Sequence, residues 1–235
     1  MADVTFSQLQ PWALVPDESR VNRAEARAER DVYREHFRYK RVTRLPVDCP
    51  PWVLGQELGW VVRSPVSVEM APLGDVDFDV PAEEELRSVG RKINRSEVWH
   101  RNNAWIATQD SGWLRLHDYR ANGTWESMFL PNGMGTVEWR LGWGVHIPER
   151  YFLMVMGMAF PGLDVPMGVI ASKTVNAMAD RGGFSIAVHP TRPLKVGRGD
   201  PVARVVLLHA DSLRSASTTI VATATTADQD SEAGH

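Results

Sequence analysis

The sequence is poor in several features that would direct its interpretation elsewhere. It contains one cysteine, Cys49, which excludes a disulfide-built scaffold. Its longest apolar run, residues 151–160 (YFLMVMGMAF), is too short for a membrane-spanning helix, which needs about 20 residues. The start MADVTFSQLQ lacks the basic and apolar regions of a signal peptide. We therefore expect a cytoplasmic protein that does not bind a membrane.

Charge of one sign is also missing, because 26 Lys and Arg residues face 29 Asp and Glu residues, for a net charge of −3. Nucleic-acid-binding domains usually carry a basic surface, so we expect no nucleic-acid partner. The chain has no GxxxxGK[ST] or GxGxxG loop, no HExxH or CxxC pair and no GxSxG elbow. We therefore predict no metal site and no tightly bound cofactor.

Two short motifs in the chain are weak indications of function. His209-Ala210-Asp211 matches the HxD part of a facial iron triad, but only the terminal His235 follows it as a further histidine. Residues 198–200 spell the cell-adhesion tripeptide Arg-Gly-Asp. In a cytoplasmic protein we interpret this tripeptide as a turn that begins a strand.

The chain itself is of ordinary globular composition, with 235 residues of which 43% are hydrophobic. Residues 17–40 predict a charged helix that rests on a sheet through a thin apolar stripe of Val21, Ala24, Ala28 and Val32. A short helix is predicted at 82–93, where Pro81 suits the first turn. The small and polar residues of 213–235 predict a disordered tail.

From residue 104 onward the pattern is mostly strand and turn. Alternating apolar segments are separated by turn-forming residues, which is typical of antiparallel sheets. We predict a mainly β fold, an antiparallel barrel or sandwich with one N-terminal helix and a short inserted helix. The predicted strands are 104–108, 113–117, 135–141, 151–158, 166–171, 183–189 and 202–208.

The order of motifs in the second half resembles the β-clip fold of deoxyuridine triphosphatases and deoxycytidine triphosphate deaminases. The motifs are residues 145–155 (VHIPERYFLMV), 168–170 (GVI), 183–188 (GFSIAV) and 193–207 (PLKVGRGDPVARVVL). The resemblance implies a β-clip architecture. The hairpin at 168–173 lacks the acid that contacts uracil in those enzymes, so the implication concerns the fold and not their activity.

A second resemblance covers about residues 45–210 and is to an uncharacterised bacterial family of unknown function. The matching segments are 59–65 (GWVVRSP), 133–139 (GMGTVEW), 148–151 (PERY), 184–193 (FSIAVHPTRP) and 199–201 (GDP). We therefore predict a β-clip-like domain at 45–212, preceded by an N-terminal arm and helix at 1–44. The sequence departs from the family's pattern at about 82–126, which we interpret as an insertion.

One predicted strand carries both core and candidate site residues. Extended alternation places Val137, Trp139 and Leu141 on one side and Glu138 and Arg140 on the other. Glu138 is a candidate acid–base and Arg140 a candidate for holding an anionic group. The alternative is a solvated face with an ordinary cross-strand pair.

The other candidate residues are distributed over the same half of the chain. His146 and His189 are candidates for acid–base catalysis, or else edge histidines. Trp139 and Trp143 either belong to the core or present their indole edges to a ligand. Lys173 and Asn176 are polar candidates for ligand binding.

Nine Trp and nine Met residues favour either a well-filled core or an apolar ligand pocket. Our first hypothesis is a small-molecule-processing enzyme of bacterial specialised metabolism with an apolar or aromatic substrate and no tightly bound cofactor. The alternative is a non-catalytic ligand-binding or assembly protein that forms a homo-oligomer, a dimer or trimer. A nucleotide-related enzyme is the weaker alternative.

Overall fold

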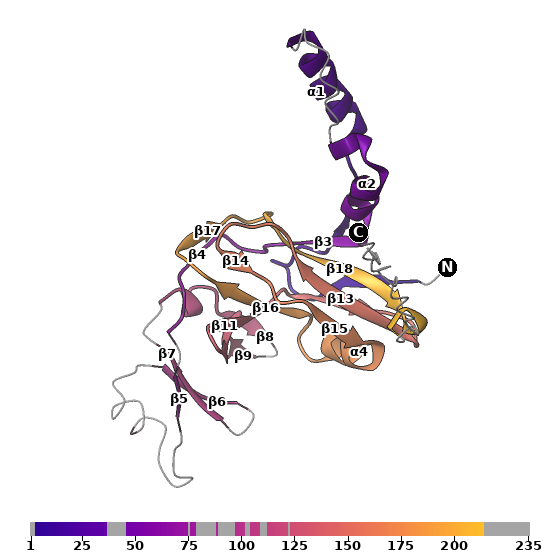
Figure 1. Cartoon of the computed structure of the whole chain (residues 1–235). Helices are drawn as coiled ribbons and strands as arrows, with labels where there is room; N and C mark the ends of the chain where they lie inside the picture. The colour runs from indigo at the N-terminus through magenta and orange to yellow at the C-terminus, as the bar shows by residue number, and fades with distance from the viewer. Residues whose placement is uncertain are drawn as a thin grey trace, which may run out of the picture.

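The computed structural model describes residues 3–36, 46–74, 76–78, 88, 97–101, 104–108, 112–121 and 123–213. Figure 1 shows a β-rich body from which helices α1 (Arg23–His36) and α2 (Pro50–Glu57) project as an arm. Helix α4 (Ser172–Asp180) lies on the body, against the strand at Trp143–His146. The prediction of a mainly β architecture is confirmed.

Two antiparallel sheets make up most of the body, and β18 lies at the centre of the larger one. No sheet among the described residues closes into a barrel. The larger sheet has the order β15 (Gly168–Ala171), β13 (Tyr151–Gly157), β18 (Pro201–His209), β3 (Trp60–Arg63), β2 (Asp17–Glu18). The second has the order β10 (Phe129–Gly133), β11 (Thr136–Arg140), β16 (Ser185–Pro190), β14 (Leu163–Asp164).

The remaining strands form smaller antiparallel pairings, and the described residues also include three short 3₁₀ helices. The strands are β1 (Thr5–Gln8) with β12 (Trp143–His146), β4 (Val68–Met70) with β17 (Leu194–Val196), β5 (Val76–Phe78) and β6 (Glu97–Arg101) with β7 (Ala104–Thr108), and β8 (Tyr119–Ala121) with β9 (Thr124–Glu126). The 3₁₀ helices are η1 (Pro46–Asp48), η2 (Gly112–Arg115) and η3 (Ala210–Leu213).

Aromatic side chains fill the interior of the body. Trp143 stacks on Phe184 with ring centroids 4.7 Å apart, and Phe129 lies 5.3 Å from Trp139. All four of these side chains are almost completely buried. Each large aromatic side chain removes a wide apolar area from water, so this cluster is a main source of the body's stability.

Several sequence predictions need correction. The predicted strand at 113–117 is wrong: the chain forms η2 there, because the neighbouring residues Trp113 and Leu114 are both buried and a strand would send them to opposite faces. The helix predicted at 82–93 and the tail predicted at 213–235 lie outside the described residues, apart from positions 88 and 213. The division into domains stays a prediction.

The N-terminal helix does not rest on a sheet as predicted. It begins at Arg23, after Asn22, whose Oδ1 accepts a hydrogen bond from the backbone N–H of Glu25 at 3.2 Å. The predicted stripe is wrong, because Ala24 and Ala28 are exposed and the half-buried positions include Ala26. The charged helix instead packs beside α2 in the arm.

Helix α2 was not predicted, because proline disfavours a helix interior and this segment holds Pro46, Pro50 and Pro51. Pro50 and Pro51 instead occupy its first positions, where a helix needs no backbone N–H. The guanidinium of Arg204, on β18, donates to the carbonyl oxygens of Gln56 and Leu58 at the end of α2, each at 2.6 Å. Burial lowers the pKa of Arg204. This buried arginine therefore anchors the arm to the body.

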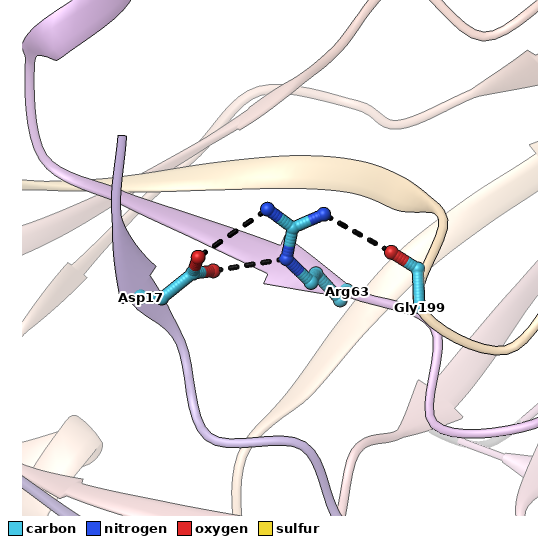
Figure 2. Close-up of polar contacts among 3 residues, drawn as sticks. All are labelled: Asp17, Arg63 and Gly199. Atoms are coloured by element: carbon cyan, nitrogen blue, oxygen red, sulfur yellow. Dashed lines mark hydrogen bonds and ion pairs between the residues drawn. The ribbon is translucent and has the colours of Figure 1, made fainter. Parts of the chain in front are cut away.

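A more exposed arginine ties the larger sheet to the turn before β18. Figure 2 shows Arg63 donating from Nε and Nη2 to the two carboxylate oxygens of Asp17, at 3.0 and 3.3 Å, and from Nη1 to the carbonyl oxygen of Gly199 at 3.1 Å. Arg198, beside Gly199, donates to the carbonyl oxygens of Trp12 and Pro65. The Arg-Gly-Asp tripeptide thus has an internal structural role, as a turn.

None of the helices among the described residues is both long and apolar enough to cross a membrane.

Candidate functional site

A hollow of about 520 Å³ lies between α4 and the outer face of the four-stranded sheet. Six of its ten lining residues have polar or charged side chains, and two glycines contribute backbone. The lining residues are Glu138, Arg140, Lys173, Thr174, Ala177, Met178, Arg181, Gly182, Gly183 and Ser185. We call this hollow the α4 pocket.

The floor of the α4 pocket comes from strand β11. Its alternation buries Val137 and Trp139 completely in the core and turns Glu138 and Arg140 outward, where they are half-buried. The pairing of β11 with β16 puts Ser185 directly opposite Arg140. The buried side of the strand therefore fixes the position of its polar side.

One wall of the α4 pocket is a face of helix α4. Lys173 and Ala177 are four residues apart and lie along one side of the helix, and Arg181, the residue directly after α4, continues this wall. Asn176 is turned elsewhere: its Oδ1 accepts from the backbone N–H of Ile147 at 3.0 Å, and its Nδ2 donates to the Ile147 carbonyl at 3.1 Å. This two-bond contact sets the position of α4 on the body.

The turn after α4 closes the end of the pocket and requires glycine. Gly182 and Gly183 have φ of 114° and 105°, which disfavour other residues. A Cβ on Gly183 would come within 2.9 Å of the Trp143 carbonyl oxygen, whereas Gly182 faces open space. The backbone of Gly182 is therefore accessible from the pocket side.

The electrostatics of the α4 pocket are cationic. Arg140 donates to Glu126 across 2.6 Å. Burial acts to lower the pKa of Arg140, but hydrogen bonds and charges from Glu126 and Tyr119 outweigh it and raise the pKa above its ordinary value. Lys173 and Arg181 form no ion pair with any residue that the structure describes. The pocket thus holds two cations that are available to a ligand.

The structure brings together three of the predicted site residues, Glu138, Arg140 and Lys173. His189 lies at the other end of β16, with its imidazole against the Gly135 turn and outside the pocket lining. His146 is exposed on β12, opposite Thr5. The three residues in the pocket remain candidates for binding or catalysis together, whereas neither histidine joins them.

Trp139 and Trp143, which the sequence offers as candidates for ligand contact, do not line the α4 pocket. Trp139 and Trp143 are completely buried, and their indole N–H groups have no hydrogen-bond acceptor among the described residues. Asn176 is committed to the Ile147 backbone. The roles predicted for these three residues stay predictions, and each would require a rearrangement of the core or of α4.

Sequence reasoning missed Arg181, Ser185 and the glycine pair. A signal was present, because the segment 172–183 (SKTVNAMADRGG) has a helical spacing of Lys173, Ala177 and Arg181 followed by a glycine stop. No group of three His, Cys, Asp or Glu side chains suited to a metal ion occurs within the described part of the chain. The chemistry at hand is that of anion binding by cations, hydroxyls and backbone, with Glu138 as the neighbouring carboxylate.

No family model and no curated protein matches the chain. Among solved structures, a dUTPase mutant from phage phi11 of S. aureus is similar with a TM-score of 0.39 and 10% identity, covering 93% of this chain and 96% of that one. A Staphylococcus bacteriophage 80alpha dUTPase with dUpNHpp has a TM-score of 0.37 and 9% identity, covering 99% and 96%. Both belong to an enzyme class that the β-clip resemblance names. At these values, nothing about the pocket or its reaction follows from the likeness.

Proposed function

We propose that the protein binds a small organic molecule with an anionic group in the α4 pocket. The observation that carries this proposal is the convergence of Arg140, Lys173 and Arg181, two of them without a described ion-pair partner, around one hollow. Charge-assisted hydrogen bonds from such groups are the strong ones in ligand recognition. Thr174 and Ser185 add hydroxyl groups that can complete the coordination of an anion.

The size and the walls of the pocket define the rest of the ligand. Its volume of about 520 Å³ is within the range of small-molecule sites. Ala177 and Met178 supply an apolar surface for the uncharged part of the molecule. A carboxylate on an aromatic acid and a phosphate on a nucleotide are two sources of the same anionic chemistry, and the binding experiment separates them.

We further propose that the protein processes this ligand, with Glu138 as the acid–base group. Its carboxylate lines the pocket beside Arg140, within the same site as the three cations. Proton transfer by a positioned carboxylate is an ordinary catalytic device. An enzyme of bacterial specialised metabolism that acts on an aromatic acid is the finer form of this proposal. A ligand-binding protein without turnover is the alternative.

Isothermal titration calorimetry with pyrophosphate, dUTP and indole-3-acetate tests the binding. We expect at least one of these anions to bind, and Lys173→Ala and Arg181→Ala each to weaken its binding about tenfold. Lys195→Ala is the matched control, because Lys195 pairs with the exposed Glu69 on another sheet. Equal affinity in the wild type and both pocket variants would overturn the proposal. Binding of dUTP alone would favour the nucleotide alternative.

Turnover is tested by mass spectrometry of the bound compound after incubation. Glu138→Gln keeps the shape of the side chain and removes its charge, so we expect binding to persist and turnover to be lost. Turnover at the wild-type rate in this variant would exclude Glu138 as the acid–base. Binding without turnover in the wild type would leave the ligand-binding alternative.

A further inference from the structure

The arm carries a second hollow, of about 420 Å³, between α1 and the segment that leads into α2. Figure 1 shows that this part of the chain projects from the body. The apolar floor includes Val53, which is buried, and Leu54, which is 69% exposed. We call this hollow the arm groove. Its lining residues are Arg23, Ala26, Arg27, Arg30, Val47, Asp48, Pro50, Val53 and Leu54.

Three arginines of α1 make the arm groove basic, and their pairing within the chain is weak. Arg30 approaches Asp48 at 3.5 Å, and its buried Nε has no partner among the described residues. Arg23 approaches Glu57 at 3.7 Å. Arg27 forms no ion pair with a described residue and is exposed. An apolar floor below an excess of positive charge suits a segment with both carboxylates and small apolar side chains.

The side of helix α1 that faces away from the groove carries carboxylates and a small apolar side chain. Glu25 and Glu29 each follow an arginine of the groove by two positions, which is about 200° around a helix. Both glutamates are exposed, as is Ala28 between them. Among the described residues, the side chain of Glu25 accepts a hydrogen bond from the side chain of Asn22 alone, and the side chain of Glu29 has no partner. Helix α1 therefore has a basic face in the groove and an acidic face away from it.

We propose that the arm groove of one molecule receives the acidic face of α1 from a second copy of this chain. Charge complementarity between the two faces carries this inference, which is independent of the function proposed for the α4 pocket. Glu25 and Glu29 of the partner would lie over Arg23 and Arg27, with Ala28 of the partner above the apolar floor. The contact would also cover exposed apolar surface at Leu54.

The positions of the two faces fix the type of contact. A helix cannot present opposite faces to one partner helix, so each molecule uses its groove with one neighbour and its acidic face with another. Such a contact is heterologous, which generates a closed ring or an open chain and not a two-fold dimer. The arm has a firm base for this purpose, since Arg204 holds the end of α2.

Sedimentation velocity of the full chain over a range of concentrations tests the proposal. We expect assemblies larger than a dimer, and about tenfold weaker self-association for Arg27→Glu and for Glu29→Arg, because each variant replaces an attraction by a repulsion. The double variant Arg27→Glu/Glu29→Arg restores opposite charges across the contact and should recover the wild-type assembly. Arg120→Glu and Glu149→Arg, both exposed on the body, are matched controls.

Mixing the two single variants gives a second readout that tests the heterologous geometry. In the mixture, the groove of Glu29→Arg meets the acidic face of Arg27→Glu in the wild-type pairing, and the groove of Arg27→Glu meets the altered face of Glu29→Arg with both charges reversed. Both contacts are attractive, so alternating copies should form assemblies larger than a dimer, whereas a two-fold contact would give dimers only. Circular dichroism verifies that each variant keeps its helices. A wild-type monomer at all concentrations, or an assembly that neither reversal weakens, would overturn the proposal. An assembly that the double variant fails to restore would do the same.

Discussion

The α4 pocket and the arm groove contain the same number of cationic side chains but differ in what supports them. The pocket has Arg140, Lys173 and Arg181, and its floor is the outer side of a strand whose inner side is completely buried. The groove has three arginines on a helix whose side chains are mostly exposed. Hydroxyls and glycine backbone complete the pocket, whereas aliphatic side chains complete the groove.

This comparison shows that charge alone does not define a ligand. A floor that the buried core fixes, with hydroxyls beside the cations, favours a small anion. Cations on a projecting helix above an apolar floor suit a macromolecular surface, because the contact must be extended to be stable. The two hollows can therefore be separated by changes that affect one region and leave the other intact.

The largest effect is expected from Trp139→Ala in the core below the pocket. Removing a completely buried indole should lower the free energy of unfolding by about 3–5 kcal/mol, through lost burial and a cavity. Urea denaturation measures the change. Trp125→Ala is the control, since Trp125 is 71% exposed and its loss should cost less than about 0.5 kcal/mol. Equal effects of the two substitutions would contradict the described core.

Arg204→Met should affect the arm and leave the pocket intact. The variant removes the charged donor that holds the carbonyls of Gln56 and Leu58, at an expected cost of about 2 kcal/mol. Limited proteolysis should cut the arm faster, while anion binding in the pocket persists. The exposed Arg120→Met serves as the control. An arm as resistant as in the wild type would show that Arg204 is not its anchor.

Asn176→Ala tests how the wall of the pocket is positioned. Both hydrogen bonds to Ile147 are lost, and we expect a loss of about 1–2 kcal/mol together with weaker anion binding, because α4 shifts. Asn176→Asp keeps the acceptor but places a carboxylate oxygen against the Ile147 carbonyl oxygen, so it should be at least as damaging. Thermal unfolding and calorimetry measure the two quantities. If unfolding and binding both stay at wild-type values, α4 is positioned by other contacts.

The smallest effect is expected from Asp17→Asn, which removes the charge from the bidentate pair with Arg63 (Figure 2). Both side chains are largely accessible to solvent, so the loss should be about 0.5 kcal/mol. The difference from the wild type should disappear at 1 M salt, because salt screens exposed charges. A difference that persists at high salt would point to a packing role for this pair.

The sequence was informative where local pattern and tertiary environment agree. Strand β11 is predicted correctly because Val137, Trp139 and Leu141 alternate with polar residues and are buried as a set. The same alternation places Glu138 and Arg140 outside, where the structure finds them in a pocket. Periodicity is reliable here because one face of the strand has a buried partner.

Other elements depend on contacts that a linear pattern does not reveal. Helix α4 is short, and the hydrogen bonds of Asn176 to a distant backbone fix it. The apolar stripe predicted for α1 assumed a sheet beneath the helix, and the described residues of the arm form none there. The indoles of Trp139 and Trp143 look identical in sequence whether they line a cavity or fill a core. The packing of Phe129 and Phe184 against these indoles, which only the structure reveals, shows that they fill the core.

Amide chemical-shift mapping by NMR tests the central claim most directly, because it observes both cationic hollows at once. The titrant is whichever of pyrophosphate, dUTP and indole-3-acetate binds in the calorimetry. If the α4 pocket is the anion site, we expect saturable shifts at Gly182, Gly183 and Ser185, with the arginine-bearing turn of α1 unchanged. Shifts confined to Arg23, Arg27 and their neighbours, or no saturable shift at the glycine pair, would contradict this assignment.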